Sequence, residues 1–229
     1  YSFDLPDGTQ TDCYLPEDIR QIHLTRKRAL EEHLTKKKNN YSNALDVSCH
    51  EGFFSLCLSR YIPSVTGVDK NKESLDKAAL MFKVQEADGI QLFNMKVEDL
   101  NPENKYDLVL CYGLLYHTEN PMGMLRKLSE LCRKTLIIET QIFPFDITGS
   151  IEDGSYQWLR PVHGMFALCK DYSHSPEGGV TDIAIVPSRG AIEYSLRQFE
   201  FKSLSIFSPK KDDFEQFVRG HRIIITAER

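Results

Sequence analysis

Two acidic residues lie where short apolar segments, typical of buried strands, come to an end. Asp46 is near the end of segment 44–47, and Asp69 directly follows segment 64–68. In open α/β sheets, ligands bind at the carboxyl ends of strands, in the turns that lead into helices. A carboxylate about 20 residues after the first such turn can accept hydrogen bonds from both hydroxyls of a ribose. The spacing therefore predicts a nucleoside site, and by itself it also fits a nicotinamide-dinucleotide enzyme.

The turn after the first acid separates these two ligand classes. Dinucleotide sites use G-x-G-x-x-G, which lets the backbone approach a pyrophosphate at a helix N-terminus. Here the turn is SCHEG (residues 48–52), which keeps one glycine, Gly52, and places Asp46 ahead of it. Carboxylates suit a cationic sulfonium and an amino group better than two phosphates. The turn therefore predicts that the ligand is an adenosyl sulfonium.

His117 is the candidate general base, because it follows a predicted strand at the expected mouth of the site. A base would accelerate proton removal from a neutral hydroxyl or amine by about 10² to 10⁴, whereas a carboxylate acceptor needs none. The ring faces of Tyr112 and Tyr116 can each favour a nearby cation by roughly 0.5 to 2 kcal/mol. The alternative is that His117 only hydrogen-bonds its own loop, beside Thr118 and Asn120.

An irregular stretch, residues 141–182, carries the candidates for acceptor binding. Loops this long in compact domains are usually lids or binding loops. Aromatic and cationic side chains in it could stack on, or pair with, a planar or anionic acceptor. These candidates are Trp158, Arg160, His163 and Tyr172, with Ser188 and Arg189 as weaker ones at the start of the next predicted helix. The alternative for Trp158 is that it only anchors the insertion to the core.

Strand-like and helix-like segments alternate from about residue 43 onward, which is typical of βαβ units and a mostly parallel sheet. The predicted strands are 44–47, 64–68, 90–95, 107–111, 135–140, 202–207 and 221–227, and the predicted helices are 19–34, 52–60, 72–85, 121–131 and 188–198. A short polar segment between the last two strands indicates an antiparallel pair at the sheet edge. We divide the chain into an N-terminal segment with a leading helix (1–40), a cofactor-binding core (41–140), a lid or substrate insertion (141–182), and a C-terminal helix with edge strands (183–229).

The composition favours a soluble cytoplasmic domain. The chain has 229 residues, enough for a sizeable core, and no apolar run near the ~20 residues that a membrane-spanning helix needs. Six cysteines without a C-x-x-C pair fit a reducing compartment, and the N-terminus lacks the features of a secretory signal. Since the first residue is not Met, we expect that an upstream region is missing.

The charge argues weakly against a nucleic-acid partner without excluding one. The formal net charge is −5, whereas nucleic-acid binders usually present a basic face. Two basic runs, 26–28 and 36–38, could contact phosphates. Because they accompany a helical pattern, we expect them to form a solvated helix face.

Four motifs together resemble the class I S-adenosylmethionine-dependent methyltransferases. LDVSCHEGFFS (45–55) resembles their motif I, and TGVDK (66–70) resembles their motif II. YDLVLCYGLLYHTENP (106–121) and LIIET (136–140) are similar to the fourth and fifth strands of a subset that includes the tRNA wobble-uridine carboxymethyl-transferring enzymes and many small-molecule methyltransferases. The likeness covers roughly residues 40 to 140. It implies a Rossmann-like α/β fold with a seven-stranded, mostly parallel sheet, and S-adenosyl-L-methionine as the cofactor.

The resemblance also assigns cofactor contacts by position. It implies that Asp46, Ser48, His50 and Gly52 line the methionine and ribose portion, and that Asp69 and Lys70 hold the ribose and the adenine edge. Glu98 and Asp99 would meet the adenine amino group, and the backbone of Cys111 and Tyr112 would face the methionine. The departure from the family pattern lies in motif I, where Ser48 and His50 replace the first two glycines. Two alternatives stay open: Asp99 could cap a turn, and Glu51 could be a charge favoured at a helix N-terminus.

We therefore expect an enzyme that methylates oxygen or nitrogen of a small molecule, with Tyr116 and His117 at the reacting groups and no metal. The nearest alternative is a tRNA-modifying methyl- or carboxymethyltransferase. An alternative of another class is a catalytically silent module that binds cofactor or a partner. The sequence leaves the acceptor and the oligomeric state open.

Overall fold

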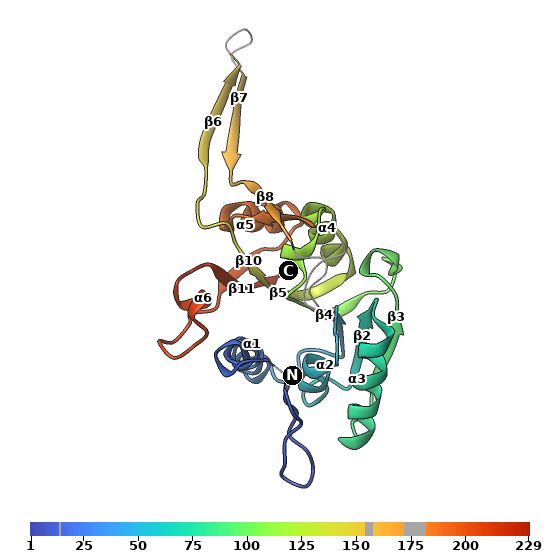
Figure 1. The fold of residues 1–229 in the computed structure, drawn as a ribbon. Coiled ribbons are helices and arrows are strands. Elements are labelled where there is room, and N and C mark those ends of the chain that lie inside the picture. Colours follow the sequence, from blue (N-terminus) through green and yellow to red (C-terminus); the bar gives the residue numbers. More distant parts are fainter. Residues whose placement is uncertain (14, 154–157, 172–181) are drawn as a thin grey trace.

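A computed structural model describes residues 1–13, 15–153, 158–171 and 182–229. Its centre is a seven-stranded sheet in the order β10-β11-β5-β4-β1-β2-β3 (Figure 1). The strands are β1 (Asn43–Val47), β2 (Ser64–Asp69), β3 (Ile90–Asn94), β4 (Tyr106–Tyr112), β5 (Cys132–Gln141), β10 (Ser203–Ile206) and β11 (Arg222–Glu228).

The sheet is parallel except at β11. Four strand pairs are parallel: β1 with β2, β1 with β4, β2 with β3, and β4 with β5. β11 runs antiparallel to both β5 and β10. The predicted Rossmann-like, mostly parallel sheet with an antiparallel edge pair is confirmed. Because β1 and β4 are neighbours in a parallel sheet, the turns that follow them open at the same edge.

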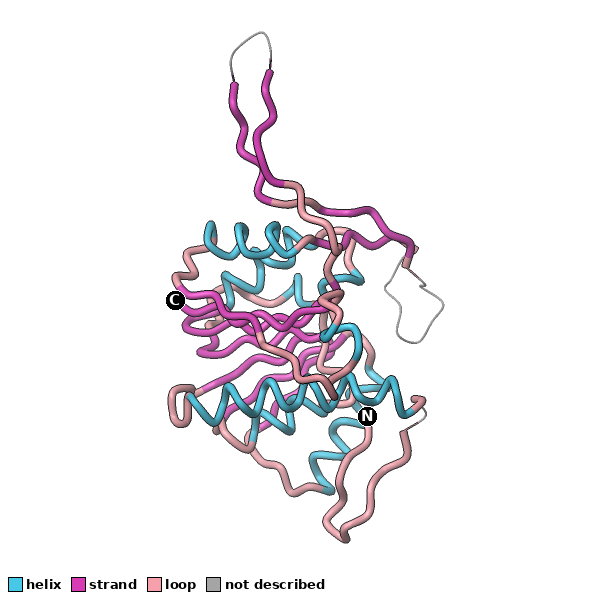
Figure 2. Tube along the Cα trace, turned by 90° about the vertical axis from the view of Figure 1, so that its left-hand side faces the viewer, coloured by secondary structure: helices cyan, strands magenta, loops and turns pink. Residues whose placement is uncertain are grey.

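Helices cover both faces of the sheet, as Figure 2 shows. The helices are α1 (Glu17–Lys36), α2 (Phe53–Ser59), α3 (Lys72–Val84), α4 (Pro121–Leu131), α5 (Arg189–Gln198) and α6 (Glu215–Val218). Successive β1 residues point to opposite faces: Ala44 packs in the cluster of α1 and α2, and Leu45 in the cluster of α4 and α5. Asp46, two residues after Ala44, therefore faces the α2 side.

None of the described helices is long and apolar enough to cross a lipid bilayer.

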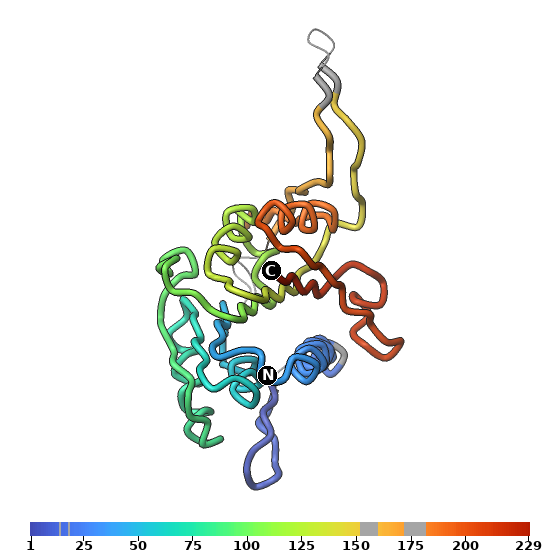
Figure 3. Tube along the Cα trace, turned by 180° about the vertical axis from the view of Figure 1, so that it is seen from behind, coloured from blue at the N-terminus to red at the C-terminus, as the bar shows by residue number. Residues whose placement is uncertain are grey.

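The segment expected to be irregular, 141–182, contains three strands, which form one antiparallel hairpin and, with the strand that follows the segment, a second antiparallel pair. β6 (Thr148–Asp153) pairs with β7 (Trp158–His163), and β8 (Phe166–Lys170) pairs with β9 (Ile183–Pro187). The β6–β7 hairpin projects from the body of the molecule, whereas β8 and β9 lie beside α4 and α5 (Figures 1 and 3). The expectation of an irregular stretch is wrong. These short strands were missed because glycines and exposed apolar residues, such as Ile151 and Leu168, obscure the alternation of apolar and polar residues that predicts a strand.

Candidate active site

The turn after β1 adopts left-handed backbone at three alternating positions. The φ angles are +53° at Ser48, +51° at His50 and +76° at Gly52. Left-handed backbone is the conformation for which glycine is the default residue. Ser48 and His50, which stand where motif I has glycines, therefore adopt the backbone conformation that glycine favours.

Hydrogen bonds to the neighbouring strand hold this turn. The backbone N–H of His50 donates to Asp69 Oδ2 over 2.9 Å, and that of Cys49 donates to the carbonyl of Val68 over 3.0 Å. Asp69 Oδ1 accepts a second bond, from the backbone N–H of Asn71 at 2.8 Å. The carboxylate of Asp69 thus joins the turns after β1 and β2.

Gly52 is required for packing as well as for conformation. A Cβ at this position would lie 2.5 Å from Cζ of Phe82 and 2.9 Å from Cβ of Ala78. Both residues belong to α3, so this helix packs directly against the backbone of the turn. The one glycine that motif I retains is the position where a side chain has no room.

Asp46 is a buried carboxyl group with one neutral partner. It is 2% exposed, and Oδ2 accepts a hydrogen bond from Ser55 Oγ at 2.7 Å. Burial raises the pKa of Asp46 from 3.8 to about 7, with a contribution from the charge of Asp69, while the hydrogen bond from Ser55 opposes the rise. A cation bound nearby would therefore stabilise the ionised form.

Four buried polar atoms around the turn have no hydrogen-bond partner in the described part of the chain. They are Nδ1 of His23, Nε of Arg26, Nδ1 of His50 and the hydroxyl of Tyr112. Buried polar groups are normally hydrogen-bonded, so such a group invites a ligand or water. Together with the acidic Asp46, these atoms fit the carboxylate and amino groups at the methionine end of S-adenosylmethionine.

These groups come together through aromatic contacts. The ring of Tyr1 lies 4.3 Å from that of His23 and 6.0 Å from that of His50. Phe54 contacts both Tyr1 and Tyr112, with ring centroids 5.8 and 5.0 Å away. Of these residues, His50 and Tyr112 were predicted from the sequence, whereas the two residues from α1, His23 and Arg26, were not.

The remaining predicted cofactor residues lie along the same edge of the sheet. Lys70 is exposed directly after β2, and Glu98 and Asp99 are exposed in a 3-10 turn, Val97–Asp99, after β3. The turn that begins at Asn101 is capped by the side chain of that residue, which accepts from the N–H of Glu103 over 3.0 Å.

Two further residues are explained by their contacts. Cys111 is fully buried in the core cluster, and burial raises its pKa. Its thiol is therefore unreactive at neutral pH. Glu51 does not begin a helix in the described structure, since α2 starts at Phe53, and its carboxylate lies 3.8 Å from Nζ of Lys77.

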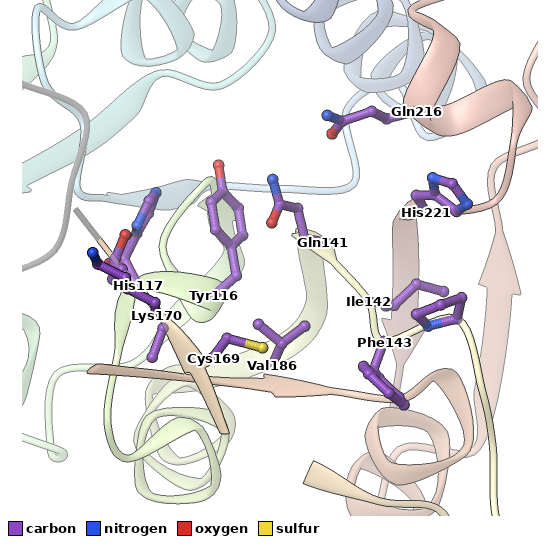
Figure 4. Close-up of a pocket in the computed structure, with 13 residues that line it drawn as sticks. Tyr116, His117, Gln141, Ile142, Phe143, Cys169, Lys170, Val186, Gln216 and His221 are labelled. Atoms are coloured by element: carbon purple, nitrogen blue, oxygen red, sulfur yellow. Dashed lines mark hydrogen bonds and ion pairs between the residues drawn. The ribbon is translucent and has the colours of Figure 1, made fainter. Parts of the chain in front are cut away.

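A cavity of about 500 Å³ opens over the ends of β4 and β5. Its walls come from the 3-10 turn Leu115–His117, the end of β5, the β8–β9 hairpin and the segment from α6 to β11. Polar and charged side chains of the wall are Tyr116, His117, Gln141, Lys170, Asp171, Gln216 and His221. In Figure 4 the polar ends of Tyr116 and Gln141 point to the same side, toward Gln216, while Cys169 and Val186 form part of the apolar floor.

His117 lies in the cavity wall and is bonded to another residue of that wall. Its Nδ1 is 2.9 Å from Oδ2 of Asp171, and the two side chains are 22% and 10% exposed. The alternative that His117 bonds only its own loop does not hold, because the carboxylate comes from Asp171, directly after β8. The loop residues bond to one another instead. Thr118 Oγ1 accepts from the N–H of Asn120, and the side chain of Asn120 caps α4.

A buried charge cluster lies behind Tyr116. Glu139 is fully buried, its Oε1 lies 2.6 Å from Nη1 of Arg222, and its Oε2 pairs with Arg26. The guanidinium of Arg222 lies 4.7 Å from the ring centroid of Tyr116 and donates to Gln216. Two arginines against one glutamate give this cluster a surplus positive charge beside the cavity.

Arg26 corrects one sequence expectation. The basic run 26–28 was expected to be a solvated helix face, but Arg26 is 5% exposed. The signal was present in the spacing, because Ile22, Leu30 and Leu34 are buried at the same four-residue interval.

The predicted acceptor-binding residues lie outside this cavity wherever the structure describes them. Ser188 is fully buried; it caps α5, accepts from the N–H of Met165 and donates to Asp146 at 2.6 Å. Arg189 pairs with Glu193 over 2.6 Å on the surface. Ser188 was therefore misread, because a helix N-cap and a binding serine look alike in sequence.

The candidates of the β6–β7 hairpin are likewise not in the wall. His163 stacks on Tyr194 with ring centroids 4.1 Å apart, and Arg160 is exposed on β7. Trp158 lies on β7, but its side chain is outside the described residues, as is the whole of Tyr172. In the described residues no group of three or more His, Cys, Asp or Glu side chains is arranged to hold a metal ion.

Known proteins with related sequences are methyltransferases. Residues 44–135 match the family described as "Methyltransferase domain". Ubiquinone biosynthesis O-methyltransferase of Vibrio parahaemolyticus is 30% identical over 192 residues, which cover 76% of this chain and 80% of that protein. tRNA U34 carboxymethyltransferases are similar too: the protein of Helicobacter pylori is 31% identical over 196 residues (78% of this chain, 65% of that protein), and that of Alteromonas mediterranea over 129 residues (52% and 39%). The chain thus spans less than two thirds of the length of these two tRNA-modifying relatives.

Solved structures share the fold. The N-terminal domain of EvdMO1 with SAH bound matches with a TM-score of 0.66 at 20% identity, over 89% of this chain and 79% of that one. Magnesium protoporphyrin IX methyltransferase from Synechocystis with bound SAM matches with a TM-score of 0.63 at 16% identity, over 96% and 86%.

Proposed function

Because this chain belongs to the class I S-adenosylmethionine-dependent methyltransferases, we propose that it methylates an oxygen or nitrogen atom of a small molecule. The observation that carries the proposal is the cavity of about 500 Å³, which is bordered by Tyr116 and His117. Small-molecule sites typically have volumes of ≈ 300–1,000 Å³ with a few convergent polar groups.

The chain's own residues would bind the cofactor and align the acceptor with its methyl group. S-adenosyl-L-methionine supplies an electrophilic methyl group on a sulfonium. Asp69 would hold the ribose, Asp46 would face the cationic end, and Arg26 and His23 would hold the carboxylate of the methionine. The enzyme then mainly has to align the acceptor within ~3.5 Å of the methyl carbon and exclude water.

A second candidate function is carboxymethyl transfer to tRNA, which two of the relatives carry in their names. The observation that favours it is the surplus positive charge of Arg26 and Arg222 against Glu139, since a carboxylated cofactor needs cations near the transferred group. The formal net charge of −5 argues against a nucleic-acid acceptor.

The two functions are separated by the donor used and by the destination of the transferred group. The protein is incubated with S-[methyl-³H]adenosylmethionine or, separately, with the carboxylated donor labelled on the transferred carbon, each with either a protein-free extract of small molecules or bulk tRNA. We expect label in the small-molecule fraction, and no salt-sensitive retention of tRNA on filters. Label in tRNA would reverse the assignment. Absence of micromolar cofactor binding by an intact fold would favour a silent module over an enzyme.

The proposed place of action is the cytoplasm. All six cysteines are free in the structure, and four of them are buried. Unpaired cysteines are typical of reducing compartments.

A further inference from the structure

His117 is held from two sides by backbone. Its own N–H donates to the carbonyl of Leu114 at 3.0 Å, and the next residue, Thr118, accepts from the N–H of Ile185 in β9 at 3.1 Å. The ring packs against that of Tyr116 with centroids 4.2 Å apart. The imidazole therefore has a fixed place at the junction of the 3-10 turn and the β8–β9 hairpin.

Asp171 is fixed by the same hairpin. It directly follows β8, and its N–H donates to the carbonyl of Asp182 over 2.9 Å. Its carboxylate is 10% exposed and lies 2.9 Å from Nδ1 of His117. An ionised carboxylate can only accept, so in the pair with ionised Asp171 the ring donates from Nδ1. In the neutral ring this leaves the lone pair on Nε2.

Among the possible acceptors, a neutral hydroxyl gains most from such a base. A carboxylate already carries its negative charge, and a neutral amine already carries a free lone pair. A hydroxyl oxygen becomes a strong nucleophile only as its proton leaves. A general base contributes about 10² to 10⁴ to such a step.

We propose that the acceptor is an alcohol or phenol, that Nε2 of His117 takes its proton, and that Asp171 is the positioning residue that fixes His117 for this step. As the oxygen–carbon bond forms, the carbon–sulfur bond breaks and its electron pair returns to sulfur, which gives neutral S-adenosylhomocysteine. The hydroxyl proton moves to Nε2. The inference rests on the proposed methyl transfer and specifies its substrate class.

The tautomer of His117 can be measured on the protein itself. Long-range ¹H–¹⁵N NMR of histidine-labelled protein with S-adenosylhomocysteine, at a pH where the ring is neutral, reports which nitrogen carries the proton. We expect the Nδ1–H form in the wild type and a shift toward Nε2–H in Asp171→Asn. Asp212→Asn, which removes an exposed carboxylate, is the matched control and should leave the tautomer unchanged. A wild-type ring protonated at Nε2 would overturn the proposal.

The chemical nature of the product tests the acceptor class. Products of the tritium assay are treated with alkali, which releases methanol from methyl esters but not from ethers, and passed over a cation exchanger, which retains methylated amines. We expect alkali-stable, unretained label whose formation slows by about 10²-fold in Asp171→Asn, with S-adenosylhomocysteine binding unchanged.

The other outcomes are distinguishable. Released methanol or retained amine would overturn the hydroxyl assignment while methyl transfer stands. If the wild-type protein does not bind S-adenosylhomocysteine, the proposed function itself is refuted.

Discussion

The buried carboxyl group of Asp46 should make the stability of the cofactor-free protein depend on pH. Its pKa is raised from 3.8 to about 7 by burial. The folded protein therefore holds a proton that the unfolded chain has lost between about pH 4 and pH 7, so the free energy of unfolding falls as pH rises through that window. At 1.36 kcal/mol per pKa unit, the full loss is about 4 kcal/mol.

Asp46→Asn removes this loss, because a neutral amide does not titrate and its oxygen can still accept from Ser55. Other buried groups also make unfolding pH-dependent in this range, among them His23. Burial lowers the pKa of His23 in the folded protein from 6.5 to about 3, and the charge of Arg26 lowers it further, whereas in the unfolded chain His23 takes up a proton as pH falls through its ordinary pKa. These groups are common to both proteins, so the difference between variant and wild type isolates Asp46. The difference in unfolding free energy should grow in favour of the variant by about 4 kcal/mol between pH 4 and pH 8.

The assay is urea unfolding followed by far-UV circular dichroism at unit steps of pH. Asp88→Asn, at an exposed position, serves as the control and should show a flat difference from the wild type. The reasoning is refuted if the difference between Asp46→Asn and the wild type changes by less than about 1 kcal/mol over this range.

Two packing and charge predictions can be checked by the same unfolding measurement. Gly52→Ala should lower the free energy of unfolding by about 2–4 kcal/mol, because alanine is strained in left-handed backbone and its Cβ clashes with α3. Gly220→Ala should lower it by only about 1–2 kcal/mol, because Gly220 has a φ of +72° but open space around it. Equal losses would show that the clash is absent. Glu139→Ala should lose about 3–5 kcal/mol because it leaves two buried guanidinium groups unpaired, whereas Glu193→Ala, which breaks an exposed pair, should change stability by about 0.5 kcal/mol or less. A small effect at Glu139 would contradict the buried cluster.

Much of the fold could be predicted because apolar segments and turns set it locally. The core strands and α3 and α4 were predicted to within a few residues, and the acids at the ends of β1 and β2 were found because strand ends are recognisable in sequence. The β6–β7 and β8–β9 hairpins were not, since two-stranded hairpins with an exposed face lack a clear period.

The missing site residues share one physical cause. Asp171 contacts His117 across 54 positions of sequence, and Arg26 contacts Glu139 across 113. No local pattern specifies such partners; only the packing of α1 and of the β8–β9 hairpin on the sheet brings them together. Even so, the four-residue interval that places Arg26 on the apolar face of α1 was visible in the sequence.

We expect the turns carrying Asp46 and Asp69 to bind an adenosyl sulfonium and not a pyrophosphate. Calorimetric titration with S-adenosylhomocysteine and with NADH, using the wild type and Asp69→Asn, tests it most directly. We predict micromolar binding of S-adenosylhomocysteine, weakened roughly tenfold or more in the variant by the lost charged hydrogen bonds, and no binding of NADH. Binding of NADH alone, or equal affinity of wild type and variant for S-adenosylhomocysteine, would contradict the account.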